Sequence, residues 1–354
     1  MHPPSLIASP RPATPLPSSR PPEAPEGESW RRALRDAIRT PEELLAFLEL
    51  PDSLLEGARR SAELFPLLVP RGFAALMERG NPADPLLRQV LPLMIEALPH
   101  DAGVRDAVGD RPARRAPGLI HKYRGRVLLI ATGSCAVHCR YCFRRHYPYG
   151  DEPGRLDDWN PALEYIAADP TIQEVLLSGG DPLMLPDTRL FALLDRIEGI
   201  PHVRRIRLHT RLPIVLPSRV TDDFVARLRR SAKRVVTVVH ANHARELGTA
   251  CREALTRLVE AGLTVLNQAV LLRGVNDSAD ALAELCEDLV DLGALPYYIH
   301  QLDRVEGSLH FEVPEAEGLQ LLSDLRARLP GYAVPRYVRE TAGESGKTEI
   351  VSTE

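Results

Sequence analysis

From residue 119 onward, apolar runs with strand character alternate with amphipathic segments of helical period. The strand candidates are residues 126–131, 174–178, 204–209, 235–240, 264–271 and 296–301. The helix candidates are residues 161–168, 188–197, 222–232, 246–261, 279–292 and 314–328. A chain that repeats strand and helix in this way forms a parallel sheet with helices outside it.

Six strand–helix repeats are fewer than the eight of a closed barrel. We therefore expect an α/β fold, a partial TIM-like (β/α)6 barrel, over residues 119–330. In such folds the chemistry gathers at the carboxyl ends of the strands. Several candidate functional residues fall at or near these ends. A cysteine-containing loop follows the first strand and Gly179-Gly180-Asp181 follows the second. His209, His240, Gln268 and Asp303 lie at or near the ends of later strands. Their common edge predicts a single site.

The segments before and after the barrel differ from it in character. Residues 28–118 read as an N-terminal helical region, in which Thr40 caps a helix with Pro41 in its first turn. Residues 64–68 and 73–77 suggest further short helices. Residues 331–354 form a C-terminal segment.

Residues 1–27 are crowded with Pro, Ser and Ala, contain no aromatic residue and lack the apolar core of a signal peptide. This composition predicts a disordered tail. A targeting or docking segment is the alternative.

Composition limits the classes of function. The 354 residues carry a formal net charge of −4, so a broad nucleic-acid footprint is not expected. No run of eighteen apolar residues exists, so we expect no membrane span. Three of the five cysteines are clustered, which favours a reducing compartment, the cytoplasm, over a disulfide framework.

Cys135, Cys139 and Cys142 have the spacing C-x3-C-x2-C. Three thiolates on one loop hold three irons of a [4Fe–4S] cluster and leave the fourth iron open to a chelating cosubstrate, whereas electron-transfer clusters usually have four cysteines. The alternatives are a disulfide pair, three unrelated thiols, or a structural zinc site. Zinc needs a fourth Cys or His, and the available His138 adjoins Cys139.

The cysteine spacing, with Tyr141 before the last cysteine, resembles the cluster loop of radical S-adenosylmethionine (SAM) enzymes. Further motifs resemble the lysine 2,3-aminomutase family, and its elongation factor P (EF-P) branch in particular. They are His-Lys-Tyr-Arg-Gly-Arg at 121–126, Arg-Tyr-Cys-Phe-Arg-Arg-His at 140–146, Ser-Gly-Gly-Asp-Pro-Leu at 178–183, Asn-Gln-Ala-Val-Leu-Leu-Arg-Gly-Val-Asn-Asp at 267–277 and Pro-Tyr-Tyr at 296–298. The resemblance covers about residues 30–350 and implies a partial barrel of the radical SAM type.

The resemblance implies that Cys135, Cys139 and Cys142 bind a [4Fe–4S] cluster whose fourth iron takes the amine and carboxylate of SAM. It assigns the methionine part of SAM to the loop Ser178, Gly179, Gly180 and Asp181, and it places Gln268 near SAM. From the residues alone, Gly-Gly-Asp is a common turn, and Gln268 is a polar strand residue with a local hydrogen bond.

The resemblance also implies pyridoxal 5′-phosphate (PLP), held by a Schiff base to Lys347, with Lys122, Tyr123 and Arg126 around its phosphate and ring. Taken alone, Lys347 reads as a solvated lysine. The family's segment is richer in glycine than this one, where Glu344 and Ser345 stand.

Three charges match the family's substrate-binding positions. Arg144 corresponds to the arginine that binds the substrate carboxylate, and Asp303 and Glu340 to the two acids that hold the distal ammonium of lysine. In the free lysine enzymes the second acid is usually aspartate, so Glu340 is a departure. Alternatively, Arg144 belongs to a basic run and the two acids are ordinary surface residues.

The resemblance therefore predicts an isomerase that converts L-α-lysine to β-lysine by 2,3-amino migration. Expected partners are L-lysine, a reductant such as flavodoxin or ferredoxin, EF-P and the ligase that attaches β-lysine to it. The alternatives are a lysine 2,3-aminomutase of small-molecule metabolism and a non-catalytic iron–sulfur or zinc-binding protein.

Overall fold

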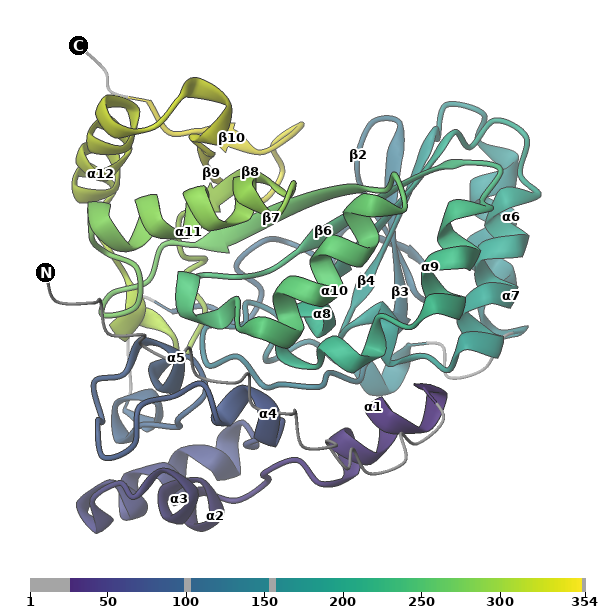
Figure 1. Cartoon of the computed structure of the whole chain (residues 1–354). Coiled ribbons are helices and arrows are strands. Elements are labelled where there is room, and N and C mark those ends of the chain that lie inside the picture. The colour runs from purple at the N-terminus through teal and green to yellow at the C-terminus, as the bar shows by residue number, and fades with distance from the viewer. Residues whose placement is uncertain (1–25, 99–102, 153–156, 352–354) are drawn as a thin grey trace, which may run out of the picture.

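The structure is a computed structural model that describes residues 26–98, 103–152 and 157–351. Within these residues ten strands form one sheet in the order β1 to β10 (Figure 1). The strands are β1 Arg114–Ala116, β2 Leu119–Tyr123, β3 Arg126–Thr132, β4 Glu174–Gly179, β5 Arg205–Thr210, β6 Arg234–Val239, β7 Thr264–Val270, β8 Leu295–His300, β9 Arg336–Arg339 and β10 Thr348–Glu349.

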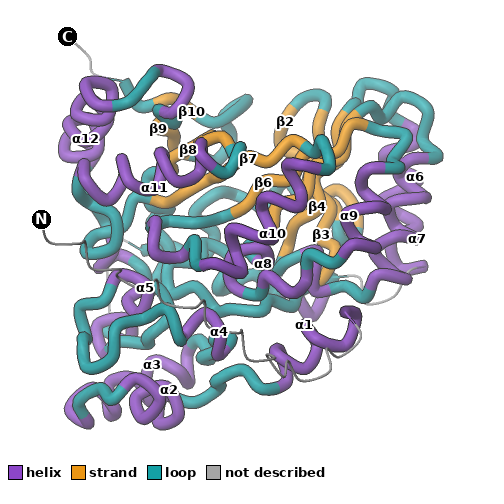
Figure 2. The backbone as a smooth tube through the Cα atoms, viewed as in Figure 1, coloured by secondary structure: helices purple, strands orange, loops and turns teal. Residues whose placement is uncertain are grey.

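Strands β3 to β9 pair in parallel, whereas β1, β2 and β10 add antiparallel pairs at the two edges. Helices connect the parallel strands and cover the outer face of the sheet (Figure 2). They are α6 Asn160–Ala168, α7 Asp187–Glu198, α8 Leu212–Val215, α9 Asp222–Arg229, α10 Thr249–Glu260, α11 Ala279–Asp291 and α12 Glu315–Arg328. All six predicted strands and all six predicted helices are present, so the expected partial (β/α)6 barrel is confirmed, with β9 as an additional parallel strand.

The two faces of β5 differ in polarity. In β5, Ile206 and Leu208 are fully buried and belong to the main hydrophobic core together with residues of the outer helices. The alternate residues Arg207 and His209 are only partly buried and lie on the opposite face. Parallel strands are usually apolar on both faces. The inner face of β5 is therefore an exception, since it carries an arginine and a histidine.

The N-terminal helical region comprises α1 Glu26–Arg35, α2 Pro41–Leu48, α3 Leu55–Leu64, α4 Arg71–Ala74 and α5 Pro85–Arg88, and it packs against one end of the barrel (Figure 1). Thr40 caps α2 as predicted, since its side chain accepts a hydrogen bond from the backbone of Glu43. Among the described residues, no helix is both long and apolar enough to cross a membrane.

The prediction of a helix at residues 64–68 is wrong. Helix α3 ends at Leu64, and Phe65 adopts an extended backbone. Pro66 explains this, because the residue before a proline is driven out of the helical region. Val69 then pairs with Ile38 in an isolated β-bridge. The predicted disordered tail falls almost wholly on residues 1–25, which lie outside the described part of the chain.

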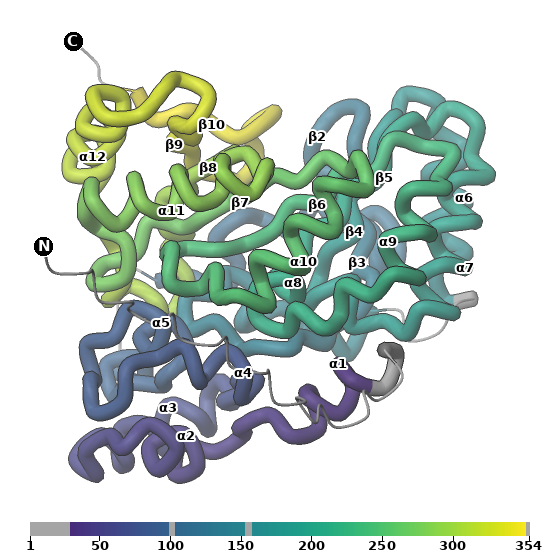
Figure 3. The backbone as a smooth tube through the Cα atoms, in the orientation of Figure 1, coloured from purple at the N-terminus to yellow at the C-terminus, as the bar shows by residue number. Residues whose placement is uncertain are grey.

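The sheet does not close by strand pairing. Its first strands, β1 and β2, and its last, β9 and β10, stay unpaired with one another within the described residues. The blue β2 and the yellow C-terminal segment nevertheless lie at the same end of the molecule (Figure 3). Side chains connect them there, as described below.

Candidate active site

The three clustered cysteines lie on the loop that follows β3, and all three are free thiols and half-buried. Burial raises the pKa of Cys135 well above its ordinary value, and that of Cys142 to about 11. In the described part of the chain no three His, Cys, Asp or Glu side chains come together as ligands of a single metal ion. His138, the candidate fourth zinc ligand, stacks on Phe65 and bonds through Nδ1 to the Pro66 carbonyl. Nδ1 of His138 is thus engaged by a backbone carbonyl, which argues against that nitrogen as a fourth zinc ligand.

The residues between and after the cysteines attach the loop to the N-terminal region. Arg140 is fully buried and donates through Nε and Nη2 to Glu96, at 2.9 and 2.6 Å. Arg145 donates to the same carboxylate at 3.0 Å. Glu96 lies in the short 3-10 helix Met94–Ala97 and is itself buried. Sequence reasoning missed Glu96, because only the fold brings it to the two arginines.

Gly179 and Gly180 are required by the cysteine loop itself. Gly179 has φ +114°, and a Cβ there would lie 2.7 Å from the carbonyl oxygen of Thr132. A Cβ on Gly180 would lie 2.3 Å from the carbonyl oxygen of Ser134. Tyr149 Oη donates to the Gly179 carbonyl at 2.6 Å. The glycines therefore let the end of β4 touch the backbone that carries the cysteines.

Asp181 and Ser178 are also engaged by protein partners. The Asp181 carboxylate accepts from Thr210 Oγ1 at 2.7 Å and from the backbone N–H groups of Arg211 and Leu183 at 2.7 and 3.0 Å. Burial raises the pKa of Asp181 to about 6 in spite of these bonds. Ser178 Oγ accepts from Arg144 Nη1 at 3.3 Å. Asp181 thus ties the ends of β4 and β5 together beside the cysteine loop.

A continuous chain of ion pairs joins five charged side chains. Lys347 Nζ donates to Glu340 Oε2 at 2.6 Å, and Lys122 Nζ donates to Glu340 Oε1 at 2.7 Å. Lys122 also pairs with Asp110 at 2.6 Å, and Asp110 accepts from Arg144 Nε at 2.7 Å. The chain links the cysteine loop to the C-terminal segment. Asp110 was not foreseen from the sequence, where it is an acid in an unremarkable loop.

Within this chain of ion pairs, neighbouring opposite charges favour the ionised forms of Glu340 and Arg144. Burial disfavours charge on Glu340, but Lys347 and Lys122 outweigh it and hold the pKa of Glu340 well below its ordinary range. Burial likewise disfavours charge on Arg144, but Asp110 outweighs it and raises the pKa of Arg144. Among the described residues no hydrogen bond involves Nη2 of Arg144. That nitrogen is available to an anionic ligand.

Asp303 is an acid close to this chain of ion pairs, where Glu340, Lys347 and Lys122 act on it electrostatically. It follows β8, and its carboxylate makes no hydrogen bond with another described residue. Burial, reinforced by the negative charge of Glu340, raises the pKa of Asp303 to about 7. A cationic group entering here would satisfy this carboxylate.

The remaining predicted positions lie on the inner face or at the edge of the barrel. Gln268 is half-buried on β7 and makes no side-chain hydrogen bond with another described residue, which does not support a local structural role. The guanidinium of Arg126 stacks on the ring of Tyr123 at 4.6 Å from its centroid. Lys122 has three protein acceptors, the third being the Val108 carbonyl at 2.7 Å. A phosphate group there would share Lys122 with these acceptors.

Two histidines in the interior carry buried atoms without partners. The Nε2 atoms of His209 and His300 are buried and make no hydrogen bond within the described residues. Burial lowers the pKa of both well below the ordinary value, and the charge of Lys347 adds to the effect. Buried polar atoms are normally paired. Unpaired ones beside Lys347 fit a site that binds a polar ligand.

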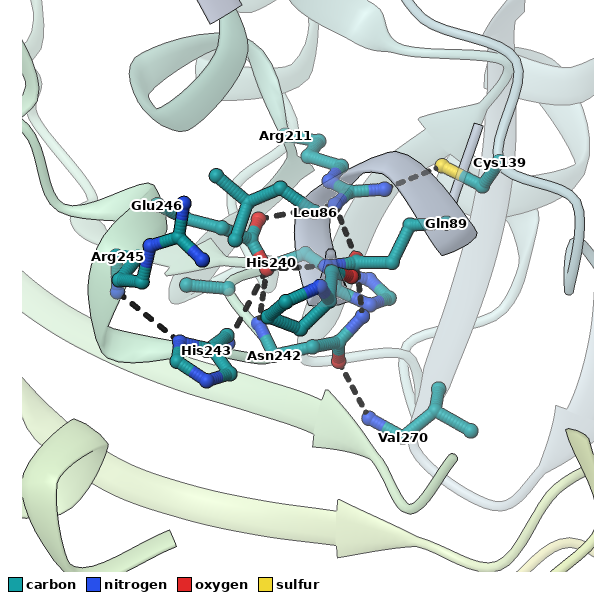
Figure 4. A network of polar contacts seen from close by, with 12 residues as sticks. Leu86, Gln89, Cys139, Arg211, His240, Asn242, His243, Arg245, Glu246 and Val270 are labelled. Atoms are coloured by element: carbon teal, nitrogen blue, oxygen red, sulfur yellow. Dashed lines mark hydrogen bonds and ion pairs between the residues drawn. The ribbon is translucent and has the colours of Figure 1, made fainter. Parts of the chain in front are cut away.

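A second polar network reaches Cys139 through Arg211 and was also missed from the sequence (Figure 4). Its members come from the N-terminal region and from the ends of β5, β6 and β7. Arg211 donates to Cys139 Sγ at 2.7 Å, and Asn242 donates to Tyr141 Oη at 2.7 Å. Gln89 and Glu246 lie between them. The single signal in the sequence was that Arg211, Asn242 and Glu246 follow strands, whereas Gln89 follows helix α5 and gave no such signal.

Taken together, the donor set fits an iron–sulfur cluster with SAM and a second, phosphate-bearing cofactor. Three thiols stand on one loop, next to a glycine-lined strand end and a buried guanidinium. Lys347 stands at the other end of the chain of ion pairs and Lys122 in its middle, and two histidine nitrogens without hydrogen bonds among the described residues lie near Lys347. Most of the predicted site residues therefore lie at the carboxyl ends of the strands or on β2 and the C-terminal segment, whereas Arg126 begins β3 at its amino end and Gln268 lies within β7.

Comparison with known proteins agrees with this arrangement. The family described as the radical SAM superfamily matches residues 129–286, from β3 through most of α11. The protein is 46% identical to the L-lysine 2,3-aminomutase of Escherichia coli, over 92% of this chain and 95% of that protein. It is 44% identical to that of Haemophilus influenzae, over 91% and 96%. It is 34% identical to that of Clostridium subterminale, over 91% of this chain and 77% of the longer relative.

The resemblance inferred from the motifs is thereby confirmed, and with it the class of enzyme, an isomerase that uses a [4Fe–4S] cluster and SAM. Identity of this extent spans both the barrel and the N-terminal region. The chain belongs to the L-lysine 2,3-aminomutase family of radical SAM enzymes.

Proposed function

We propose that this protein converts L-lysine to β-lysine by moving the amino group from C2 to C3. The observation that carries the proposal is one chain of ion pairs that contains Arg144, whose Nη2 makes no hydrogen bond among the described residues, and Glu340, with the acid Asp303 close to Glu340. A substrate with a carboxylate at one end and an ammonium at the other matches this order of charges. A distal carboxylate, as in glutamate, would be repelled by the two acids.

Each group has an assigned task in this proposal. Cys135, Cys139 and Cys142 hold the cluster, and the loop Ser178, Gly179, Gly180 and Asp181 together with Gln268 accommodates SAM. Lys347 holds PLP covalently, while Lys122, Tyr123 and Arg126 receive its phosphate and ring. When bound, the cluster and SAM supply a 5′-deoxyadenosyl radical, and PLP supplies the conjugated system that stabilises a radical during migration.

The chain's own residues orient the substrate and control its charges. Arg144, fixed by Asp110 and Ser178, binds the substrate carboxylate through its free nitrogen. Asp303 and Glu340 accept from the distal ammonium, which gives the Asp303 carboxylate a hydrogen-bonding cation. Lys347 would have to give up its bond to Glu340 and its proton in order to hold PLP through its neutral amine. The buried, neutral His209 and His300 add polar atoms without adding charge.

We further propose that the product serves β-lysylation of EF-P, with flavodoxin or ferredoxin as reductant, in the cytoplasm. The motif Arg-Tyr-Cys-Phe-Arg-Arg-His at 140–146 supports this branch. So does the higher identity to the two relatives of matching length, 46% and 44%, than to the longer one, 34%. A lysine 2,3-aminomutase of small-molecule metabolism is the second candidate, favoured by the names of the matched relatives, which mention L-lysine and no protein substrate.

An anaerobic assay tests the proposal. Cluster-reconstituted protein is incubated with SAM, PLP, dithionite and L-lysine, and the products are analysed for β-lysine and 5′-deoxyadenosine. We expect β-lysine from the wild type and none from Cys139→Ala or Lys347→Ala. Cleavage of SAM without β-lysine would contradict the assignment of lysine. No cleavage by protein that holds its cluster would favour the non-catalytic alternative. Transfer of labelled β-lysine to EF-P by its ligase separates the two metabolic roles.

A further inference from the structure

The side chain of Arg211 is aimed at a cluster cysteine. Arg211 follows β5 at its carboxyl end, and its backbone N–H is fixed by Asp181 at 2.7 Å. Its Nη1 donates to Cys139 Sγ at 2.7 Å. Its Nε is buried and makes no hydrogen bond within the described residues. The guanidinium therefore offers one donor to the thiol and keeps another unpaired close by.

Glu246 and Gln89 hold the guanidinium in place. Nη2 of Arg211 donates to Gln89 Oε1 at 2.6 Å and to Glu246 Oε2 at 2.9 Å. Glu246 is fully buried, and its other oxygen accepts from Gln89 Nε2 at 3.0 Å and from the backbone of Asn242 at 2.9 Å. Figure 4 shows these side chains converging on the guanidinium. Gln89 and Glu246 together thus fix the position of the Arg211 side chain.

A fixed cationic donor at a ligating sulfur has a physical consequence beyond packing. The reduction potential of an iron–sulfur cluster depends on its net charge, on hydrogen bonds to its sulfurs and on its exposure to solvent. Reduction adds negative charge, and a charge-assisted hydrogen bond to sulfur stabilises the more negative state. Arg211 is 7% exposed, so water screens its charge weakly.

We propose that Arg211 is a positioning residue that raises the reduction potential of the cluster by hydrogen bonding to Cys139, and that Glu246 and Gln89 hold it there. The inference rests on the proposed function only in requiring a [4Fe–4S] cluster on the three cysteines. The step is a one-electron reduction of the cluster by an external low-potential donor, in which no covalent bond forms or breaks. Gln89, from the segment after α5, makes the N-terminal region part of the redox site.

An EPR-monitored redox titration of the reconstituted full chain tests this. Iron and sulfide content establish that the cluster is present, and neither lysine nor PLP is added, so the result does not depend on β-lysine formation. For Arg211→Met we expect the equilibrium for one-electron reduction to fall about tenfold, which is a lowering of about 59 mV. Arg211→Lys, which keeps a positive charge, should recover part of the shift.

Arg245→Met is the matched control. Arg245 lies at the margin of the same network, where it pairs with Asp84 at 2.7 Å and donates to the Leu76 carbonyl without touching a cysteine. The cluster of the Arg245→Met variant should have the same reduction potential as the cluster of the wild type.

An unchanged potential in Arg211→Met with an intact cluster would overturn the proposal. If that variant does not retain the cluster, the neutral but polar Arg211→Gln decides by the same measurement. If Arg211→Met and Arg211→Gln both lose the cluster while Arg245→Met retains it, the role of Arg211 is purely structural, and the proposal is likewise overturned.

Discussion

Lys347 Nζ lies 2.6 Å from Glu340 Oε2, and the other oxygen of Glu340 accepts from Lys122 at 2.7 Å. Lys122 belongs to β2 at one edge of the sheet, whereas Glu340 directly follows β9 near the other. Ion pairs, rather than strand pairing, therefore bridge the open side of the barrel. The same carboxylate faces the proposed cofactor lysine and the proposed substrate, so its replacement tests the site directly.

Replacing Glu340 by Gln removes the charge that binds the distal ammonium. A hydrogen bond to a charged group contributes about 1.5–3 kcal/mol, so kcat/KM for lysine should fall about 10–100-fold. The measurement is the initial rate of β-lysine formation at several lysine concentrations. Glu344→Gln, an exposed acid in the same segment, is the control and should change the rate less than about twofold. Equal effects of the two substitutions would contradict the role of Glu340.

Substrate affinity should depend on the protonation of Asp303. Because burial and Glu340 raise the pKa of Asp303 to about 7, the carboxylate is lost as the pH falls through that value. The lysine ammonium then loses a partner, so KM should rise as the pH decreases from about 8 to about 6. A pH profile of kcat/KM checks this, with Asp303→Asn as the comparison. The variant should bind lysine weakly at every pH, and a wild-type KM independent of pH would refute the assignment.

Glu96 should be critical for stability although it touches no predicted ligand. Its carboxylate is buried between Arg140 and Arg145. Removing one partner of a buried ion pair leaves an uncompensated charge and costs about 3–5 kcal/mol. Chemical denaturation of Glu96→Gln should show this loss in the free energy of unfolding. Glu306→Gln, which removes an exposed partner of Arg105 at 3.8 Å, should remain within about 0.5 kcal/mol of the wild type.

Gly180→Ala should damage cluster chemistry without abolishing the fold. The added Cβ would meet the Ser134 carbonyl oxygen at 2.3 Å, so the cysteine loop must shift. A displacement of about 1 Å at a catalytic site costs up to about 10²-fold in rate. SAM cleavage by reconstituted protein should therefore fall about 10–100-fold. Gly150→Ala, where an added Cβ meets nothing within 4 Å, controls for the substitution and should cleave SAM normally.

The central elements of the fold were predictable because long runs of Val, Ile and Leu alternate with amphipathic helices. The edge strands were not predictable. β9 is four residues with Arg at both ends, and β10 is two exposed residues, so neither has an apolar pattern to detect. Both form because the strands already assembled offer backbone partners.

The residues of the site also fall into a group that the sequence predicts and a group that it does not. Cysteines, glycines and the acids at strand ends stand out by motif and spacing. Asp110, Glu96 and Arg211 do not, because each acts on a residue 34, 44 or 72 positions away in sequence. Their roles arise from tertiary contacts, which no local pattern encodes.

The most direct test of 2,3-amino migration by this protein follows the migrating nitrogen itself. L-Lysine labelled with ¹⁵N at the α-amino group is converted anaerobically by the reconstituted enzyme, and the product is examined by ¹³C–¹⁵N NMR. We expect β-lysine that carries the label on the C3 nitrogen and none on C2 or C6. Label that remains on C2, or that is lost to ammonia while SAM is cleaved, would contradict 2,3-amino migration by this protein.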